Sequence, residues 1–154
     1  MPQMNTTPVV KPIDLENKQI IVMRDDLGMD AGKIGAQAAH ASLAAVLKGG
    51  RVQSATITTR DLFIIPMDDS LQAWLEGRFK KITLRAKSEA ELLAVYQKAL
   101  DAGLRCALIQ DAGLTVFDGV PTYTCCAIGP ALPEVLKPIT GKLQLFKNSK
   151  QKEV

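Results

Sequence analysis

The fold class is decided by residues 19–50, QIIVMRDDLGMDAGKIGAQAAHASLAAVLKGG. The segment opens with a short apolar run, residues 19–24, which is typical of a buried strand. After a polar turn, residues 33–48 form a stretch rich in Ala, Gly and Ser that ends at Gly49 and Gly50, as expected for a helix. Because these side chains are small, the helix backbone can lie close against a sheet. A strand that leads directly into such a helix indicates an α/β domain.

The rest of the chain continues to alternate between strand and helix patterns. Further strands are expected at residues 79–86, 105–110 and 124–128, and further helices at residues 71–77, 88–102 and 132–136. Ser88 and Glu91 have the spacing of a capping box, which supports a helix start there. We therefore expect an α/β fold: a single three-layer α/β/α domain with a mostly parallel mixed sheet of about four strands.

The length of 154 residues fits one domain with short additions at both ends. We interpret residues 1–17 as a polar N-terminal lead-in, residues 18–147 as the domain and residues 148–154 as a Lys-rich tail. Residues 49–70 are expected to form a hairpin or flap inserted into the domain. No apolar run approaches the roughly 18 residues of a membrane span, and the start lacks the pattern of a signal peptide, so we expect no membrane partner.

The cysteine and histidine content argues against metal and thiol chemistry. Cys106, Cys125 and Cys126 lie in apolar strand-like runs, so we expect them to be buried, reduced and not catalytic. With one histidine and no CxxC or HxxxH spacing, we expect no metal site and no cofactor. Reduced cysteines and the absence of an export signal point to a cytoplasmic protein. The net charge of +3 permits an anionic partner without requiring one.

Polar residues gather where the expected strands end. A helix beginning at Lys33 places Gln37 and His40 in one stripe with it, starting at the sheet edge where ligands bind in open α/β folds. The other candidates at this edge are Asp111, Thr115 and Thr124. A solvated polar stripe fits the same pattern, so the residues alone establish only a polar site at the strand edge.

Three spaced motifs resemble the type II peptidyl-tRNA hydrolases. The first comprises residues 26–29, 32–37 and 40–41, DLGM, GKIGAQ and HA, and the second comprises residues 108–115, LIQDAGLT. The third begins at Thr124 and continues through residues 127–130, AIGP, and 140–143, TGKL. The resemblance covers about residues 18–146, in order. Two departures are a longer stretch between Gly49 and Ser70 and a loop between Thr115 and Thr124 that is about one residue longer.

This resemblance implies hydrolysis of the ester that joins a peptide to the 3′ ribose of tRNA, which recycles tRNA from abandoned translation. It implies that Asp111 orients or deprotonates the water, directly or through a threonine hydroxyl, and that Lys33 supplies positive charge to the oxyanion or the leaving oxygen. Thr115 and Thr124 would position water or substrate, and Gln37 would add an amide hydrogen bond. His40 is expected to support the substrate site one turn further along.

The resemblance also implies contacts to the acceptor end of tRNA, and it allows a homodimer. Arg24, Lys80 and Lys81 are our candidates for substrate binding, because phosphate contacts hold a nucleic acid without reading its sequence. The alternative is a non-catalytic RNA-binding module on the same fold. The joint presence of Lys33 and Asp111, with Gln37 and Thr115, argues against such a loss of the site. A small-molecule-binding α/β protein is disfavoured, because neither GxxxxGK[ST] nor GxGxxG occurs.

Overall fold

The computed structural model describes residues 16–55 and 60–147. Nearly all of the expected N-terminal lead-in and the whole Lys-rich tail therefore lie outside the described residues, as do residues 56–59 within the expected hairpin. Within the described residues, no helix combines the length and the apolar character that crossing a membrane requires.

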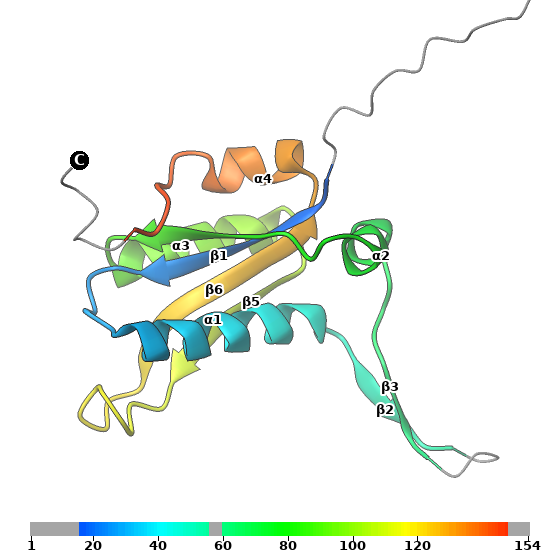
Figure 1. Ribbon diagram of the computed structural model, residues 1–154, viewed down its shortest axis with the longest axis horizontal. Coiled ribbons are helices and arrows are strands. Elements are labelled where there is room, and N and C mark those ends of the chain that lie inside the picture. Colours follow the sequence, from blue (N-terminus) through cyan, green and yellow to red (C-terminus); the bar gives the residue numbers. More distant parts are fainter. Residues whose placement is uncertain (1–15, 56–59, 148–154) are drawn as a thin grey trace, which may run out of the picture.

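A four-stranded mixed sheet forms the centre of the domain (Figure 1). In spatial order, its strands are β4 (Lys81–Ala86), β1 (Lys18–Arg24), β6 (Thr122–Ala131) and β5 (Cys106–Asp111). Strands β1 and β4 are parallel, whereas β6 is antiparallel to both β1 and β5. The α/β class and the mixed sheet of four strands are confirmed. The expectation that most of the strand pairs are parallel is wrong.

The connections explain this strand arrangement. Between β1 and β4 the chain passes through helices α1 (Ala31–Val46) and α2 (Asp69–Glu76), and such a long crossover is what parallel neighbours need. Between β5 and β6 there is only the loop of residues 112–121, so the chain reverses and the two strands pair antiparallel. Strand β6 then fills the position between β5 and β1, where Val22 lies opposite Cys126.

Helices cover both faces of the sheet, which gives the expected three layers (Figure 1). Helix α1 packs on one face, while α3 (Glu89–Asp101) and α4 (Pro133–Thr140) pack on the other. Side chains of a strand alternate between the two faces, so Ile20 and Val22 join the core beneath α3, and Ile21 and Met23 join the core beneath α1. Each face thus has its own hydrophobic core.

Short polar side chains set where α1, α2 and α3 begin. Asp30 caps α1 by accepting a hydrogen bond from the backbone N–H of Lys33 at 2.8 Å, so the helix starts earlier than the expected residue 33. Ser88 caps α3 by accepting from the N–H of Glu91, as the capping-box spacing predicted. Helix α2 is capped by Asp68, which accepts a hydrogen bond from the backbone N–H of Leu71, so this helix also starts earlier than the expected residue 71.

A two-stranded hairpin projects from the domain beyond the C-terminal end of α1 (Figure 1). Strands β2 (Arg51–Gln53) and β3 (Leu62–Ile64) pair antiparallel and make no ladder with the central sheet. The guanidinium of Arg105 donates to the carbonyl of Lys48 at 3.1 Å and to that of Pro66 at 2.8 Å, so it ties the two ends of the hairpin to the domain.

Candidate active site

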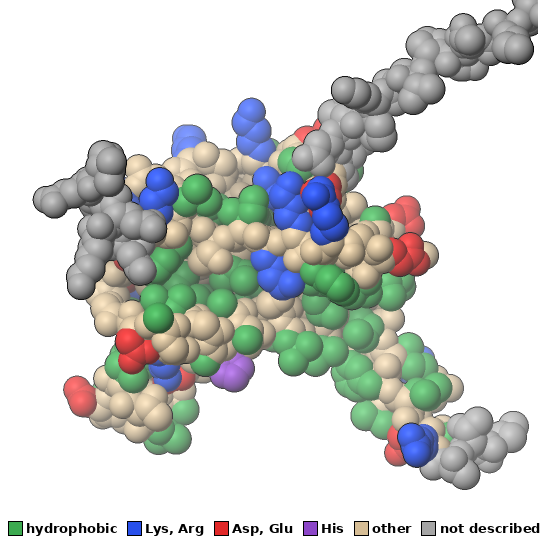
Figure 2. Space-filling model, viewed as in Figure 1, with side chains coloured by type: hydrophobic (Ala, Val, Ile, Leu, Met, Phe, Trp, Pro, Cys, Tyr) green, Lys and Arg blue, Asp and Glu red, His purple; other side chains and the backbone are tan. Residues whose placement is uncertain are grey.

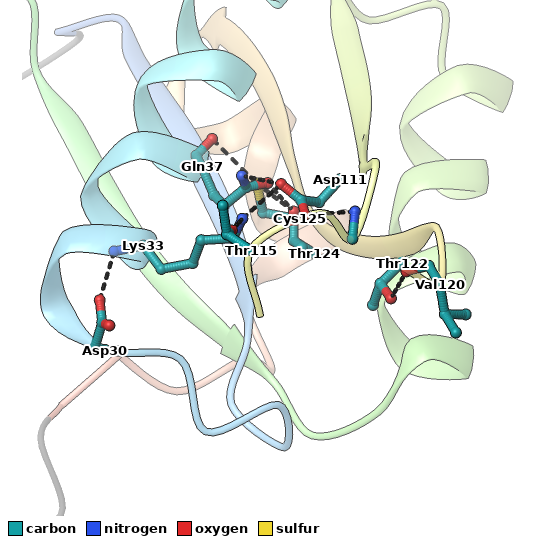
Figure 3. A network of polar contacts seen from close by, with 10 residues as sticks. Asp30, Lys33, Gln37, Asp111, Thr115, Val120, Thr122, Thr124 and Cys125 are labelled. Atoms are coloured by element: carbon teal, nitrogen blue, oxygen red, sulfur yellow. Dashed lines mark hydrogen bonds and ion pairs between the residues drawn. The ribbon is translucent and has the colours of Figure 1, made fainter. Parts of the chain in front are cut away.

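A polar network lies where the N-terminal end of α1 meets the end of β5 and the start of β6 (Figure 3). Lys33 and Gln37 project from α1, Asp111 is the last residue of β5, and Thr124 lies near the start of β6. Thr115 comes from the loop between those two strands. The structure therefore brings together five of the residues that the sequence singled out, from segments far apart in the chain.

An ion pair between Lys33 and Asp111 forms the centre of the network. The ammonium of Lys33 donates to Oδ2 of Asp111 at 2.7 Å and to the hydroxyl oxygen of Thr115 at 3.1 Å (Figure 3). The side chains of Lys33 and Asp111 are 13% and 15% exposed, so the pair is largely shielded from bulk water yet still reachable from solvent. Partial burial strengthens such a pair relative to one on the open surface.

Gln37 connects this ion pair to the core. Its amide N–H donates to Asp111 Oδ2 at 3.0 Å, and its Oε1 accepts from the hydroxyl of Thr124 at 2.5 Å. Gln37 is 2% exposed and Thr124 is fully buried, so the two side chains form the floor of the site. The hydroxyl of Thr124 thereby fixes which end of the amide faces Asp111.

The helix that carries Lys33 and Gln37 lies close to the sheet because of its small residues. Spacing of four residues places the two side chains one above the other on the same face of α1. Further along that face, Ala41 and Ala45 are fully buried against the sheet. Bulkier residues there would hold the helix away from β5 and β6. The alanines therefore determine how close the Lys33 ammonium comes to the end of β5.

The environment of Asp111 stabilises its ionised form. The hydrogen bond from Lys33 lowers the pKa of this carboxyl from its ordinary value, and the backbone N–H of Gly113 lowers it further. That N–H donates to Oδ1 of Asp111 at 2.9 Å. A carboxylate held ionised in this way can accept a hydrogen bond from a water molecule and stabilise positive charge near it.

The loop after Asp111 requires glycine at its first turn. Gly113 has a φ of +80°, and a Cβ there would lie 2.3 Å from the carbonyl oxygen of Val120. Further along, Phe117 packs against the core beneath α1, and the Lys33 ammonium lies 5.5 Å from the centre of its ring. Sequence reasoning missed the contributions of Gly113 and Phe117, although the Asp-Ala-Gly turn was a signal for the first.

Arg24 lies near the site but is held by other partners. Its guanidinium donates to both carboxylate oxygens of Asp26, to Glu89 at 3.0 Å and to the carbonyl of Tyr123 at 3.1 Å. The Arg24 side chain is 9% exposed. These contacts join the end of β1 to α3 and to β6, where Tyr123 directly precedes Thr124.

The remaining candidates for substrate binding lie away from the network. His40 is exposed on α1 (Figure 2), one turn beyond Gln37. Lys80 contacts Glu16, and the ammonium of Lys81 lies 4.6 Å from the centre of the Trp74 ring. Lys81 starts β4 opposite Gln19, whereas the network adjoins the other end of β1, so both lysines lie at the opposite edge of the sheet.

The cysteines lack the properties of nucleophiles. Cys106, Cys125 and Cys126 are free and buried, as expected from the sequence. Burial raises the pKa of Cys125 to about 11, and it also raises the pKa of Cys126. The Cys125 thiol donates to the carbonyl of Gln37 at 3.3 Å, which adds to the floor of the site. Among residues 16–55 and 60–147, no three His, Cys, Asp or Glu side chains are grouped so as to hold a metal ion.

Comparison with known proteins identifies the family to which the chain belongs. The model of the family described as peptidyl-tRNA hydrolase PTH2 matches residues 17–146, which include the whole network. The chain belongs to this family. It is 42% identical over 134 residues to the peptidyl-tRNA hydrolase of Aeropyrum pernix, covering 84% of this chain and 95% of that protein. It is also 37% identical over 129 residues to the peptidyl-tRNA hydrolase of Methanocaldococcus jannaschii, covering 84% of this chain and 99% of that protein. The resemblance read from the three motifs is therefore confirmed.

Proposed function

We propose that this protein hydrolyses the ester bond between a peptide, or an N-blocked amino acid, and the 3′ ribose of tRNA. One observation carries the proposal: in a member of the PTH2 family, the Lys33 ammonium lies 2.7 Å from Asp111 Oδ2 in a partly shielded site that solvent can reach. In this reaction water adds to the ester carbonyl carbon, and the carbon–oxygen bond to the ribose then breaks. The peptide leaves as a carboxylate, and the ribose oxygen takes up a proton.

Asp111 holds the attacking water. A carboxylate has about four acceptor positions, and within the described residues three are taken by Lys33, Gln37 and the N–H of Gly113. The fourth accepts a hydrogen bond from water and directs its lone pair toward the ester carbon. Because its pKa is lowered, the Asp111 carboxylate is a weak base. Its main role is therefore to orient the water molecule, and removal of a proton from that water is a smaller part of its role.

Lys33 stabilises the charge that develops on the substrate. An ammonium has three N–H donors, and within the described residues two of them go to Asp111 and Thr115. The third donor faces the substrate, where it stabilises the oxyanion or the departing ribose oxygen. Thr115 positions Lys33 and the water, whereas Thr124 acts through Gln37 because its hydroxyl is buried.

The decisive experiment incubates the protein with N-acetyl-aminoacyl-tRNA and follows release of the N-acetyl amino acid. Hydrolysis by the wild-type protein is expected, and loss of it in Asp111→Asn ties the activity to this site rather than to a contaminant. Binding of the tRNA without hydrolysis would instead support the alternative, a non-catalytic RNA-binding module on the same fold.

The tRNA is bound through its phosphates near the acceptor end. Basic residues near the C-terminal end supply part of this charge, and so do Lys80, immediately before β4, and Lys81 at its start. Because both of these lysines lie at the edge of the sheet opposite the network, they contact phosphates further from the ester. Contacts of this kind release counterions, so the apparent affinity should fall steeply as salt rises from about 50 to 200 mM. A KM that stays constant over this range contradicts phosphate contacts and leaves recognition to the ester and the peptide.

Two further properties of the protein, its location in the cell and its oligomeric state, can be tested separately from its activity. We expect the protein to act in the cytoplasm, where translation leaves peptidyl-tRNA, and cell fractionation followed by immunoblotting tests this. The resemblance to the family also allows a homodimer, and sedimentation equilibrium at micromolar concentration tests this directly. A sedimenting mass equal to that of one chain would exclude the dimer under those conditions.

A further inference from the structure

The loop between β5 and β6 exposes aliphatic side chains beside the polar network. Within residues 112–121, Leu114 is 86% exposed, Val116 is 46% exposed and Val120 is 60% exposed. Scattered apolar residues on a surface are ordinary, but three within one short loop that also supplies a site residue are not. The loop projects from the sheet beside the N-terminal end of α1 (Figure 1), and hydrophobic side chains cover part of this projection (Figure 2).

The loop is held in this shape by its own contacts. The N–H of Gly119 donates to the carbonyl of Gly113 at 2.9 Å, and the N–H of Val120 donates to the carbonyl of Phe117 at 2.8 Å. Phe117 points inward and packs against the core beneath α1. The aliphatic side chains are therefore presented on a preformed surface, which lowers the entropy lost when a ligand binds there.

This surface is continuous with the reacting centre. Thr115 stands between Leu114 and Val116 in the chain, and its hydroxyl accepts a hydrogen bond from the Lys33 ammonium at 3.1 Å. An ester bound at Lys33 and Asp111 consequently has this loop as a neighbour. Any group of the substrate that contacts the loop must therefore lie within a few covalent bonds of the ester.

The substrate has a peptidyl half and a tRNA half, and the side chains of the loop indicate which half lies against it. Residues 112–121 contain no Lys or Arg and one carboxylate, Asp118, so the loop does not attract phosphates. Its one aromatic residue, Phe117, is partly buried against the core with the Lys33 ammonium near its ring, so the ring is already engaged by other groups and does not stand free for a base to stack on. Uncharged aliphatic side chains instead favour contact with an apolar amino acid side chain in the peptidyl half.

We propose that Leu114 and Val116 contact the side chain of the amino acid esterified to tRNA, and that they make the enzyme favour substrates whose last residue is apolar. The inference rests on the proposed function, because it assigns the peptidyl half of that substrate to this loop. The tRNA half then lies on the side of the network away from the loop.

The test uses one tRNA acylated in turn with N-acetyl-leucine and with N-acetyl-glycine, so that the nucleic acid is constant. In Leu114→Ser, kcat/KM is expected to fall about three- to tenfold for the leucyl substrate and less than twofold for the glycyl substrate, because only the first has a side chain to lose contact. Val116→Thr keeps the shape of the residue and should show the same asymmetry to a smaller extent. Leu100→Ser, on α3, is the matched control and should change neither value.

Several results would overturn the proposal. Equal losses on both substrates would assign Leu114 a structural role, and no loss on either would make it ordinary solvated surface. If Leu114→Lys raises kcat/KM on both substrates and steepens the salt dependence, the loop faces the RNA. If Leu114→Ser changes the sedimenting mass, the loop faces a second copy of the chain. Failure of the wild-type protein to hydrolyse either substrate would instead refute the proposed function.

Discussion

The hydroxyl of Thr124 donates to Oε1 of Gln37 at 2.5 Å, and neither side chain is open to solvent. This contact orients the amide so that its N–H groups face Asp111, to which one of them donates at 3.0 Å. A buried residue of β6 thus sets the hydrogen bonding of a carboxylate at the end of β5. The hydrogen bonding of Asp111 therefore involves two buried side chains in addition to Lys33.

Removing the hydroxyl of Thr124 should therefore act through Gln37. In Thr124→Val, Oε1 of Gln37 loses a buried donor, so the free energy of unfolding should fall by about 1–3 kcal/mol and kcat should fall with little change in KM. Thr124→Ser keeps the hydroxyl and should restore kcat. Chemical denaturation and steady-state kinetics measure both effects, and a Ser variant as impaired as the Val variant would show that the methyl group matters instead.

Substitution of the two charged residues should lower turnover more than binding. In Asp111→Asn the shape is kept and the charge is lost, and in Lys33→Ala the cation is lost without weakening helix propensity. For each variant, kcat is expected to fall on the order of 10²–10³-fold, as for other groups that stabilise a transition state electrostatically. Thermal melts run in parallel must show folded protein. Near-normal turnover in both folded variants would refute the assignment.

The ionisation of Asp111 should depend on Lys33. The folded-state pKa lies below the ordinary value of about 3.9, so the stabilisation from the pair is complete above that value and is lost as pH falls through the folded pKa. In Lys33→Ala the pKa should rise toward the ordinary value. A titration of the carboxyl carbon by ¹³C NMR measures this in both proteins, and identical titration midpoints would show that Gly113 and Gln37 alone account for the shift.

Arg24 is expected to contribute chiefly to stability. Replacement by Gln breaks contacts with Asp26 and Glu89, so the free energy of unfolding should fall by about 1–3 kcal/mol and the melting temperature by several degrees. At a temperature where the variant is folded, kcat should remain within about threefold of wild type. A normal melting temperature with a raised KM would instead support the role in substrate binding suggested by the sequence. Lys87→Gln, an exposed cation near the same edge, serves as the control.

The sequence by itself determined the α/β class, the family and the core of the site. Spacing of four residues in a helix places Lys33 and Gln37 on one face whatever the rest of the chain does, and the motif around Asp111 places a carboxylate after a strand. Only the tertiary structure decided that β6 lies antiparallel between β1 and β5, that Thr124 faces Gln37, that Arg24 binds Glu89 and that Lys80 lies at the far edge. These contacts join segments that are far apart in the chain: Arg24 and Glu89 are 65 residues apart, and Gln37 and Thr124 are 87 residues apart. Local periodicity carries no information about which distant segments pair.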